Sequence, residues 1–402
     1  MKRWKKIALV LLGLVLVAQA PFAYRRYKLG RLADAIAEVN ASRAPREEDR
    51  FDEYAGVFHV HSSLGGHSPG RLEEIVEAAK SERLAFVVMT EHPSPLVDTA
   101  RATLRGEHEG VLFVGGSELA ASNGGRLFAL PGLAQPANNA PLQELAARAK
   151  SEGGLAVVGY PSEVTDWSLK DYDAVEVYNL YTNSKSVNYV TLFFDGLWSY
   201  RSYPDLLFAR FYERPDDALK KWDELNASGS RVYAVAGNDA HANVGFSLGG
   251  QTGDKIFDFK LDPYERSFRI VRNHVLLDKD TPLDEASLLK ALRAGRSFFA
   301  FDIFGDSTGF RFTAENGTDT RVMGDEIRLP EAGAVKLSAR TPVRCRTVFF
   351  RDGQVISTFA DSTLAEVSVE RAGVYRVEAY LDQLGPLLKD KPWIISNPIF
   401  VR

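Results

Sequence analysis

The stretch 56-GVFHVHSSLGGH-67 decides how the rest of the chain is interpreted. His59 and His61 are two residues apart after an apolar run, and alternate residues of a β-strand point to the same face. His67 follows in a loop rich in serine and glycine that can fold back over the strand end. Imidazoles that converge in this way suit zinc, iron or copper. The alternative is a pair of hydrogen-bonded core histidines, so the interpretation depends on the downstream sequence.

After this stretch, apolar runs alternate with helical patterns. The runs AFVVMT, VLFVGG and LAVVGY, which begin at Ala85, Val111 and Leu155, are almost wholly apolar. Such runs are expected for strands that are buried on both faces of a parallel sheet. Residues 71–83 carry apolar side chains at the spacing of one helical face. Repeated strand–helix units predict an α/β sheet or barrel with functional side chains at the carboxyl ends of its strands.

The N-terminus carries information on the cellular compartment. Four basic residues among the first six precede an apolar run from Ile7 to Ala18, which continues after Gln19 to Ala23. This pattern is typical of a secretory signal or a signal anchor, at the short end for a membrane span. A cleavage site at 18–20 is disfavoured by Pro21, and a buried helix by the charges on both sides of the run. We expect an uncleaved anchor with the body of the protein exported, either membrane-anchored or periplasmic or extracellular.

Near Phe301 the helical periodicity gives way to short β-rich segments. Turn formers such as Asp352-Gly353 separate segments such as VYRVEAY at Val374, a pattern that predicts a small antiparallel sandwich. The linker before the barrel is charged, and a helix is expected in it over 29–40. The predicted parts are residues 1–24, a signal anchor or signal peptide; 25–54, a linker; 55–302, a metal-binding barrel; and 303–402, a β-sandwich-like domain.

Composition limits the partners and the kind of metal site. The formal net charge of −4 over 402 residues gives no reason to expect nucleic acid as a partner. The single cysteine, Cys345, excludes an intrachain disulfide framework and a cysteine-ligated metal cluster. Any metal site must therefore use histidine and carboxylate ligands.

Side chains that can bind metal recur where the predicted barrel strands end. His92 follows the run at Ala85, Glu118 follows the run at Val111, and Asp239 and His241 follow a later run, VYAVAG. Each has an ordinary alternative, such as a surface carboxylate or a turn residue. Together these alternatives are weak, because five of the seven histidines fall at strand ends of one predicted sheet. The sequence therefore predicts a metal site at the carboxyl ends of the strands.

With these residues the chain resembles the PHP family, the polymerase and histidinol phosphatase domain of metal-dependent phosphoesterases, over 56–300. The family motifs HxH with a later histidine, TDH, GxE and DxH occur in the same order and strand context. They are matched by His59, His61, His67, Thr90-Glu91-His92, Gly116-Ser117-Glu118, Asp239 and His241. The resemblance implies an α/β fold: a distorted (β/α)7 barrel with a metal cluster at its carboxyl rim. The small all-β sandwich-like domain would follow it, and the N-terminal hydrophobic helix would precede it.

The resemblance also implies two groups of metal ligands. These are His59, His61, Glu118 and Asp239 for one group, and His67, His92 and His241 for the other. We expect one or two divalent ions per chain, zinc, manganese or iron, because imidazole and carboxylate ligands suit all three. A metal-activated hydroxide would be the nucleophile, since metal coordination brings the pKa of water towards neutrality.

Two positions depart from the family pattern. Family members usually have a histidine where this chain has Arg126, and His-Pro where it has Tyr160-Pro161. Both positions normally serve one ion of a three-metal cluster, so at most two ions are expected here. We expect Arg126 to hold a substrate oxyanion, because guanidinium binds phosphate bidentately, and Tyr160 to hydrogen-bond the leaving oxygen. With Asp239 they are the expected catalytic residues; the alternative is lost ligands replaced by packing.

These observations predict an exported, membrane-tethered metal-dependent hydrolase, most specifically a phosphoesterase. Its expected partners are a small anionic substrate and, through the N-terminal segment, the membrane. One alternative is a carboxylic ester or amide hydrolase that uses the same metal-activated water. Another is a non-catalytic binding protein on a degenerate PHP fold, which the presence of all seven matched ligands disfavours.

Overall fold

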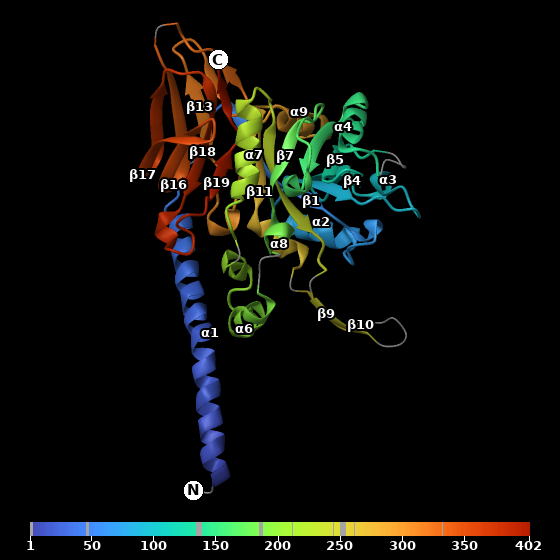
Figure 1. The fold of residues 1–402 in the computed structure, drawn as a ribbon, viewed down its shortest axis with the longest axis vertical. Helices are drawn as coiled ribbons and strands as arrows, with labels where there is room; N and C mark the ends of the chain where they lie inside the picture. The colour runs from blue at the N-terminus through green and yellow to red at the C-terminus, as the bar shows by residue number, and fades with distance from the viewer. Residues whose placement is uncertain are drawn as a thin grey trace.

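The computed structural model has three parts: a long N-terminal helix, an α/β barrel and a β-rich C-terminal region (Figure 1). This arrangement confirms the predicted order of a hydrophobic helix, a barrel and an all-β region. The residues that the structure describes are 3–45, 48–133, 139–184, 188–210, 212–243, 245–249, 255–260, 262–331 and 333–402.

Seven strands close into the barrel, and the last pairs back onto the first. In spatial order they are β1 Phe51–Val60, β2 Phe86–Glu91, β4 Val111–Ala120, β5 Arg126–Leu130, β6 Leu155–Gly159, β7 Ala174–Asn179 and β8 Tyr233–Ala240. Neighbours are parallel except at β5, which runs antiparallel to both β4 and β6. The reversed strand is the distortion of the (β/α)7 pattern.

The barrel strands are apolar because both of their faces are covered. Every residue of β2, β6 and β8 is buried. Helices pack on the outside, and α2 buries Ile75, Ala78 and Ala79 from the face predicted over 71–83. These outer helices are α2 Leu72–Ser81, α4 Leu142–Ser151, α7 Asp216–Ala227, α8 Tyr264–Ile270 and α9 Glu285–Arg293. The shorter helices are α3 Thr99–Ala102, α5 Leu180–Ser184 and α6 Tyr189–Ser199.

The C-terminal region is built on two long antiparallel strands, β16 and β17. The first half of β16 pairs with β13 and its second half pairs with β18, so this one strand connects the two parts of the sheet. The strands are β13 Arg311–Glu315, β14 Thr320–Val322, β15 Glu326–Ile327, β16 Val335–Arg351, β17 Gln354–Val369, β18 Gly373–Tyr380, β19 Ile394–Ser396 and β20 Ile399–Val401.

Main-chain hydrogen bonds join this region to the barrel. Strand β11, Arg272–Asp278, pairs antiparallel with the first half of β1; β12, Ser297–Ala300, pairs with β11; and β19 pairs with β12. The sheet is therefore continuous across the predicted boundary at 302–303, and the boundary itself falls in a short 3-10 helix, Asp302–Phe304. The remaining strands are β3 Gly106–His108, on the edge of β4, and the hairpin of β9 Gly245–Gly249 and β10 Lys255–Lys260.

The N-terminal helix α1 is a single element over Arg3–Ala41 and includes the helix expected over 29–40. Its later part is fixed to the body of the protein, where Leu29, Leu32 and Val39 are buried. The apolar first part projects away from the body (Figure 1), and by length and composition it could cross a membrane. This segment is therefore a candidate for a signal sequence or a membrane anchor.

A buried polar network holds the barrel against the C-terminal region. His274 of β11 lies with Nδ1 2.8 Å from Glu53 Oε1 and Nε2 3.0 Å from Asp302 Oδ2. Arg311 of β13 donates to Glu53 Oε2 at 2.6 Å. Burial alone would lower the pKa of His274, but Asp302 and Glu53 raise it to about 9, so the ring is an imidazolium that donates from both nitrogens. His274 therefore links the two regions and lies outside the candidate site.

We expect the stability of the folded protein to fall between pH 6.5 and 9. The pKa of His274 is about 9 when folded and 6.5 when unfolded, so its contribution is complete below pH 6.5 and is lost as pH rises towards 9. The loss is on the order of 3 kcal/mol. Thermal unfolding in detergent should show this fall in the wild type and in the surface control His108→Gln, and a flatter profile in His274→Gln. Identical pH profiles for all three proteins would contradict the expectation.

Candidate metal centre

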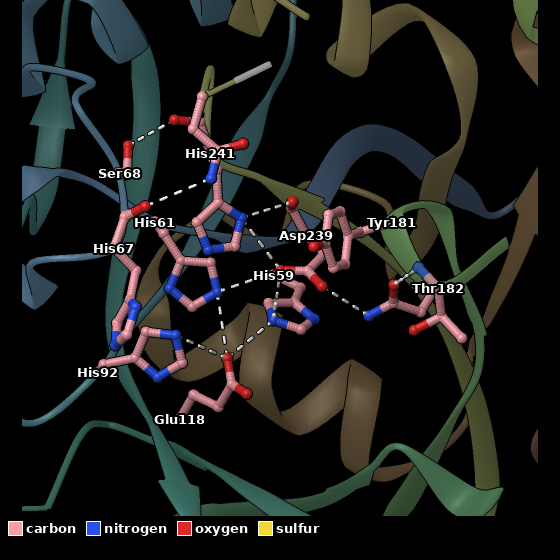
Figure 2. A network of polar contacts seen from close by, with 12 residues as sticks. His59, His61, His67, Ser68, His92, Glu118, Tyr181, Thr182, Asp239 and His241 are labelled. Carbon is pink, nitrogen blue, oxygen red and sulfur yellow. Dashed lines mark hydrogen bonds and ion pairs between the residues drawn. The ribbon is translucent and has the colours of Figure 1, made fainter. Parts of the chain in front are cut away.

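The barrel brings side chains from four strands to one end (Figure 2). This convergence follows from topology, because parallel strands place their carboxyl ends at the same rim. The side chains at this rim are His59 of β1, His61 just after it, His92 just after β2, Glu118 of β4, Asp239 of β8 and His241 just after β8. His67 follows in the loop after β1 and is exposed.

Local backbone distortion aims two of these side chains. His59 has φ 71° and lies where the pairing of β1 with β2 and β8 shifts register. Asp239, opposite this shift, has φ 48°. A left-handed conformation costs a non-glycine residue about 1 kcal/mol or more, and such strain is typical of functional sites. The expected alternation of His59 and His61 along a regular strand is thus replaced by a bulge that still delivers both imidazoles to the site.

Four buried ligand atoms lie close together at the centre of the site. They are His59 Nε2, His61 Nε2, Glu118 Oε2 and Asp239 Oδ1, and their nitrogen–oxygen separations are 3.0, 3.1, 3.3 and 3.5 Å. The ligand atoms of His59, His61 and Glu118 all lie within 4.8 Å of one another, and Asp239 Oδ1 lies beside both imidazoles. Within the described part of the chain, Asp239 Oδ1 and both ring nitrogens of His61 are buried without a well-aligned hydrogen bond. The donor set and its spacing therefore fit a divalent ion.

A second group shares His61 with the first. The ligand atoms of His61, His92 and His241 all lie within 4.8 Å of one another. The rings of His92 and His241 stack on that of His61 at 4.6 and 4.3 Å between centroids. The ring of His67 lies 4.8 Å from that of His92, on the outer side of the group. The structure thus brings His92 and His241 together as expected, with His61 rather than His67 nearest to them.

The electrostatics prepare both groups for a cation. Burial lowers the pKa of His92 to about 3 and that of His241 to about 4, with a contribution from His61, so both rings are neutral at physiological pH. Burial would raise the pKa values of Glu118 and Asp239, but the adjacent His59 and His61 hold both well below their usual range. The site therefore offers two charged carboxylates, Glu118 and Asp239, and the neutral imidazoles of His92 and His241.

Glu176 is a functional residue that the sequence reasoning missed. Its Oε1 lies 2.5 Å from His59 Nδ1, and this contact directs His59 Nε2 towards Glu118 and Asp239. A carboxylate behind a ligating histidine fixes its tautomer and raises its basicity. The sequence feature that could have indicated it is a single carboxylate inside the otherwise apolar strand AVEVYN. Gly237 makes room for it, since a Cβ there would lie 1.8 Å from Glu176 Oε1.

Arg126 and Tyr160 each contact one of the two carboxylates, on the oxygen that faces away from the imidazoles. Arg126 Nε lies 2.9 Å from Glu118 Oε1, and the Tyr160 hydroxyl donates to Asp239 Oδ2 at 2.7 Å. Each carboxylate thus turns one oxygen to the imidazoles and the other to Arg126 or Tyr160. Burial and then Asp239 raise the pKa of Tyr160, which keeps its hydroxyl protonated as a donor. The guanidinium lies over the Tyr160 ring, 5.1 Å from its centroid.

The centre opens into a cavity of about 410 Å³. Its lining includes Arg126, Tyr160, the two carboxylates, His67 and Tyr181. The loop after β1 is held in place by Glu91, which accepts hydrogen bonds from the Ser62 hydroxyl at 2.6 Å and from the Thr103 hydroxyl at 3.1 Å. The carboxylate of the Thr-Glu-His motif therefore positions this loop.

Comparison with known proteins finds remote likeness among solved structures. No protein-family model matches the chain, and neither does any curated protein sequence. Among solved structures, the chain is similar to a two-domain protein from Bacteroides vulgatus described as containing a predicted PHP-like metal-dependent phosphoesterase. The identity is 14%, the TM-score is 0.41, and the alignment covers 89% of this chain and 98% of that chain. A likeness this remote does not assign a function here.

We expect Glu176→Gln to weaken metal binding by about 10–100-fold, because loss of the charge behind His59 lowers its basicity. Competition with a chromogenic chelator would measure the affinity for zinc and manganese. Glu107→Gln, an exposed carboxylate on β3, is the matched control and should bind as the wild type does. Unchanged affinity in Glu176→Gln would show that the contact with His59 does not tune the ligand.

Proposed function

We propose that this protein is a metal-dependent hydrolase that cleaves phosphate esters with a metal-activated water. The observation that carries the proposal is the four buried ligand atoms at 3.0–3.5 Å, directly beside a cavity that a guanidinium lines. The buried set of imidazole and carboxylate ligands supports metal binding, and Arg126 supports an anionic substrate. We also propose one or two ions per chain, from zinc, manganese and iron.

Each protein group has a defined task in this proposal. When bound, the metal would supply Lewis acidity and lower the pKa of water. His59, His61, Glu118 and Asp239 would hold one ion, while His92 and His241 would serve a second with His61 or His67. Glu176 keeps the His59 tautomer, and Asn179 donates to both Glu176 and Asp239 at 3.2 Å. These contacts keep the ligands in place while substrate binds and leaves.

Arg126 and Tyr160 have different tasks. Arg126 forms an ion pair with Glu118 through Nε, and a guanidinium carries five N–H donors, so its other donors can bind a phosphate oxygen in the cavity. The single Tyr160 proton is directed at Asp239. We therefore propose that Tyr160 positions this carboxylate, in place of the contact to the leaving oxygen that we expected from the sequence.

We further propose that α1 anchors the protein and that the barrel is exported. The apolar part of α1 is exposed and preceded by basic residues, and the fold leaves it unburied. Fractionation of the full-length protein with membranes would support the anchor. A soluble form that begins at Pro21 or Tyr24, found by N-terminal sequencing, would replace the anchor with a cleaved signal.

We expect His61→Ala and Asp239→Ala each to remove bound metal and hydrolysis while the barrel stays folded. His61 belongs to both ligand groups, and Asp239 provides a charged ligand. Metal content by mass spectrometry, activity and thermal unfolding would be compared with the wild type and with the control His108→Ala. Full metal content and activity in His61→Ala would refute the ligand assignment.

We expect Arg126→Ala to lower kcat/KM on phosphate esters by about 10–100-fold without loss of metal, because one charge-assisted hydrogen bond to the substrate is removed. Arg126→Lys should recover part of this loss, since a lysine keeps the charge. A panel of chromogenic phosphoesters and carboxylic esters gives the rates. Preference for carboxylic esters would favour the alternative hydrolase, and metal binding without any hydrolysis would favour a binding protein.

A further inference from the structure

Helix α6 has an apolar face that the described part of the chain leaves largely exposed. Val190, Phe193 and Leu197 recur at the spacing of one helical face, and 68%, 61% and 68% of their surfaces are exposed. Exposed apolar side chains gathered on one helix mark an interaction site. The question is what covers this face.

The opposite side of α6 is fixed to α1, and the two helices lie side by side in Figure 1. Phe194 packs on Phe22 with 5.0 Å between ring centroids, and Asp195, which is buried, lies 3.5 Å from Arg25. The Trp198 indole donates to Gln19 Oε1 at 2.9 Å. These contacts place α6 beside residues 19–25 of α1.

This part of α1 is where its apolar run ends. Gln19 is the single polar residue between Ile7 and Ala23, and it lies four residues, or about 6 Å, before the end of the run. The next turn of α1 exposes Tyr24 and Tyr27 and carries Arg25, Arg26 and Lys28. Aromatic and basic side chains in this arrangement are typical of the layer between lipid tails and water.

The same helix is connected to the metal centre. Strand β7 ends at Asn179, which contacts Asp239, and α5 follows at once. From α5, Tyr181 lines the cavity with its ring 6.2 Å from that of His241. Helix α6, Tyr189–Ser199, lies on the same side of the barrel as the β9–β10 hairpin that follows β8 (Figure 1). The cavity and the apolar face of α6 thus belong to one side of the molecule.

We propose that α6 lies in the interfacial layer of the membrane that α1 crosses, and that the substrate is the phosphorylated head group of a lipid in that membrane. The proposal rests on the proposed function, because it names the substrate class of the same centre. Its reaction adds a water oxygen to phosphorus and breaks the bond between phosphorus and the lipid oxygen. The lipid oxygen takes a proton, so the products are a lipid alcohol and inorganic phosphate or a phosphate monoester.

The membrane contact is tested without any hydrolysis. Leu197→Cys and Val355→Cys would carry a spin label in the full-length protein in phosphatidylcholine vesicles, where the native Cys345 is buried. Val355 of β17 is 58% exposed and is the matched control. The label at 197 should be accessible to oxygen dissolved in lipid and protected from a water-soluble nickel complex, and the label at 355 should show the reverse. A label at 197 that is as accessible to nickel as the control overturns the membrane contact.

The substrate is tested with phosphatidic acid and phosphatidylglycerol in the same vesicles. Phe193→Ser with Leu197→Ser should lower lipid hydrolysis about tenfold and leave metal content and the rate on a soluble chromogenic phosphoester unchanged. The control pair Val355→Ser with Leu364→Ser should change neither rate. Hydrolysis of the soluble ester but of neither lipid overturns the lipid substrate alone. Hydrolysis of nothing overturns the proposed function as well, while the spin-label result still stands.

Discussion

Two buried carboxylates, Glu118 and Asp239, face two buried imidazoles, and the rest of the centre depends on how these charges are balanced. Removing an ionised carboxylate from water is costly unless it is paired. Burial would lower the pKa values of His59 and His61, yet the neighbouring carboxylates, Glu118 and Asp239 among them, raise both. The two carboxylates thus favour the protonated form of both imidazoles, and a divalent ion bound among the four side chains would take the place of those protons as the positive charge. Since metal binding displaces protons, affinity for metal and pH are linked.

The surroundings fix this arrangement from three directions. Glu176 supports His59, Arg126 supports Glu118, and Tyr160 supports Asp239. Each support comes from a different strand or strand end, so the barrel itself sets the geometry of the ligands. The left-handed backbone at His59 and Asp239 lies at the same rim, where β1 and β8 pair on both sides of their register shift.

Much of the fold follows from local patterns. The apolar runs at Ala85, Val111 and Leu155 became buried strands, and ligand candidates at strand ends met because parallel strands share a rim. The reversal of β5, the bulge at His59 and the support from Glu176 could not be predicted, because each depends on which strands become neighbours in space. The same reason applies to Arg126 and Tyr160, whose carboxylate partners lie 8 and 79 residues away along the chain. Sequence spacing indicates which side chains reach the rim but not which of them touch.

The pairing of β12 with β19 has a consequence for how the protein is put together. Strand β12, Ser297–Ala300, is wholly buried, and among the described residues its second edge pairs with β19, Ile394–Ser396. A polypeptide released before Ile394 is made would leave that edge open, with two phenylalanines beside unpaired amides. Open apolar edges recruit strands from other molecules. Strand β19 thus completes the sheet formed by β11 and β12, and it is synthesised after all of the metal-binding strands.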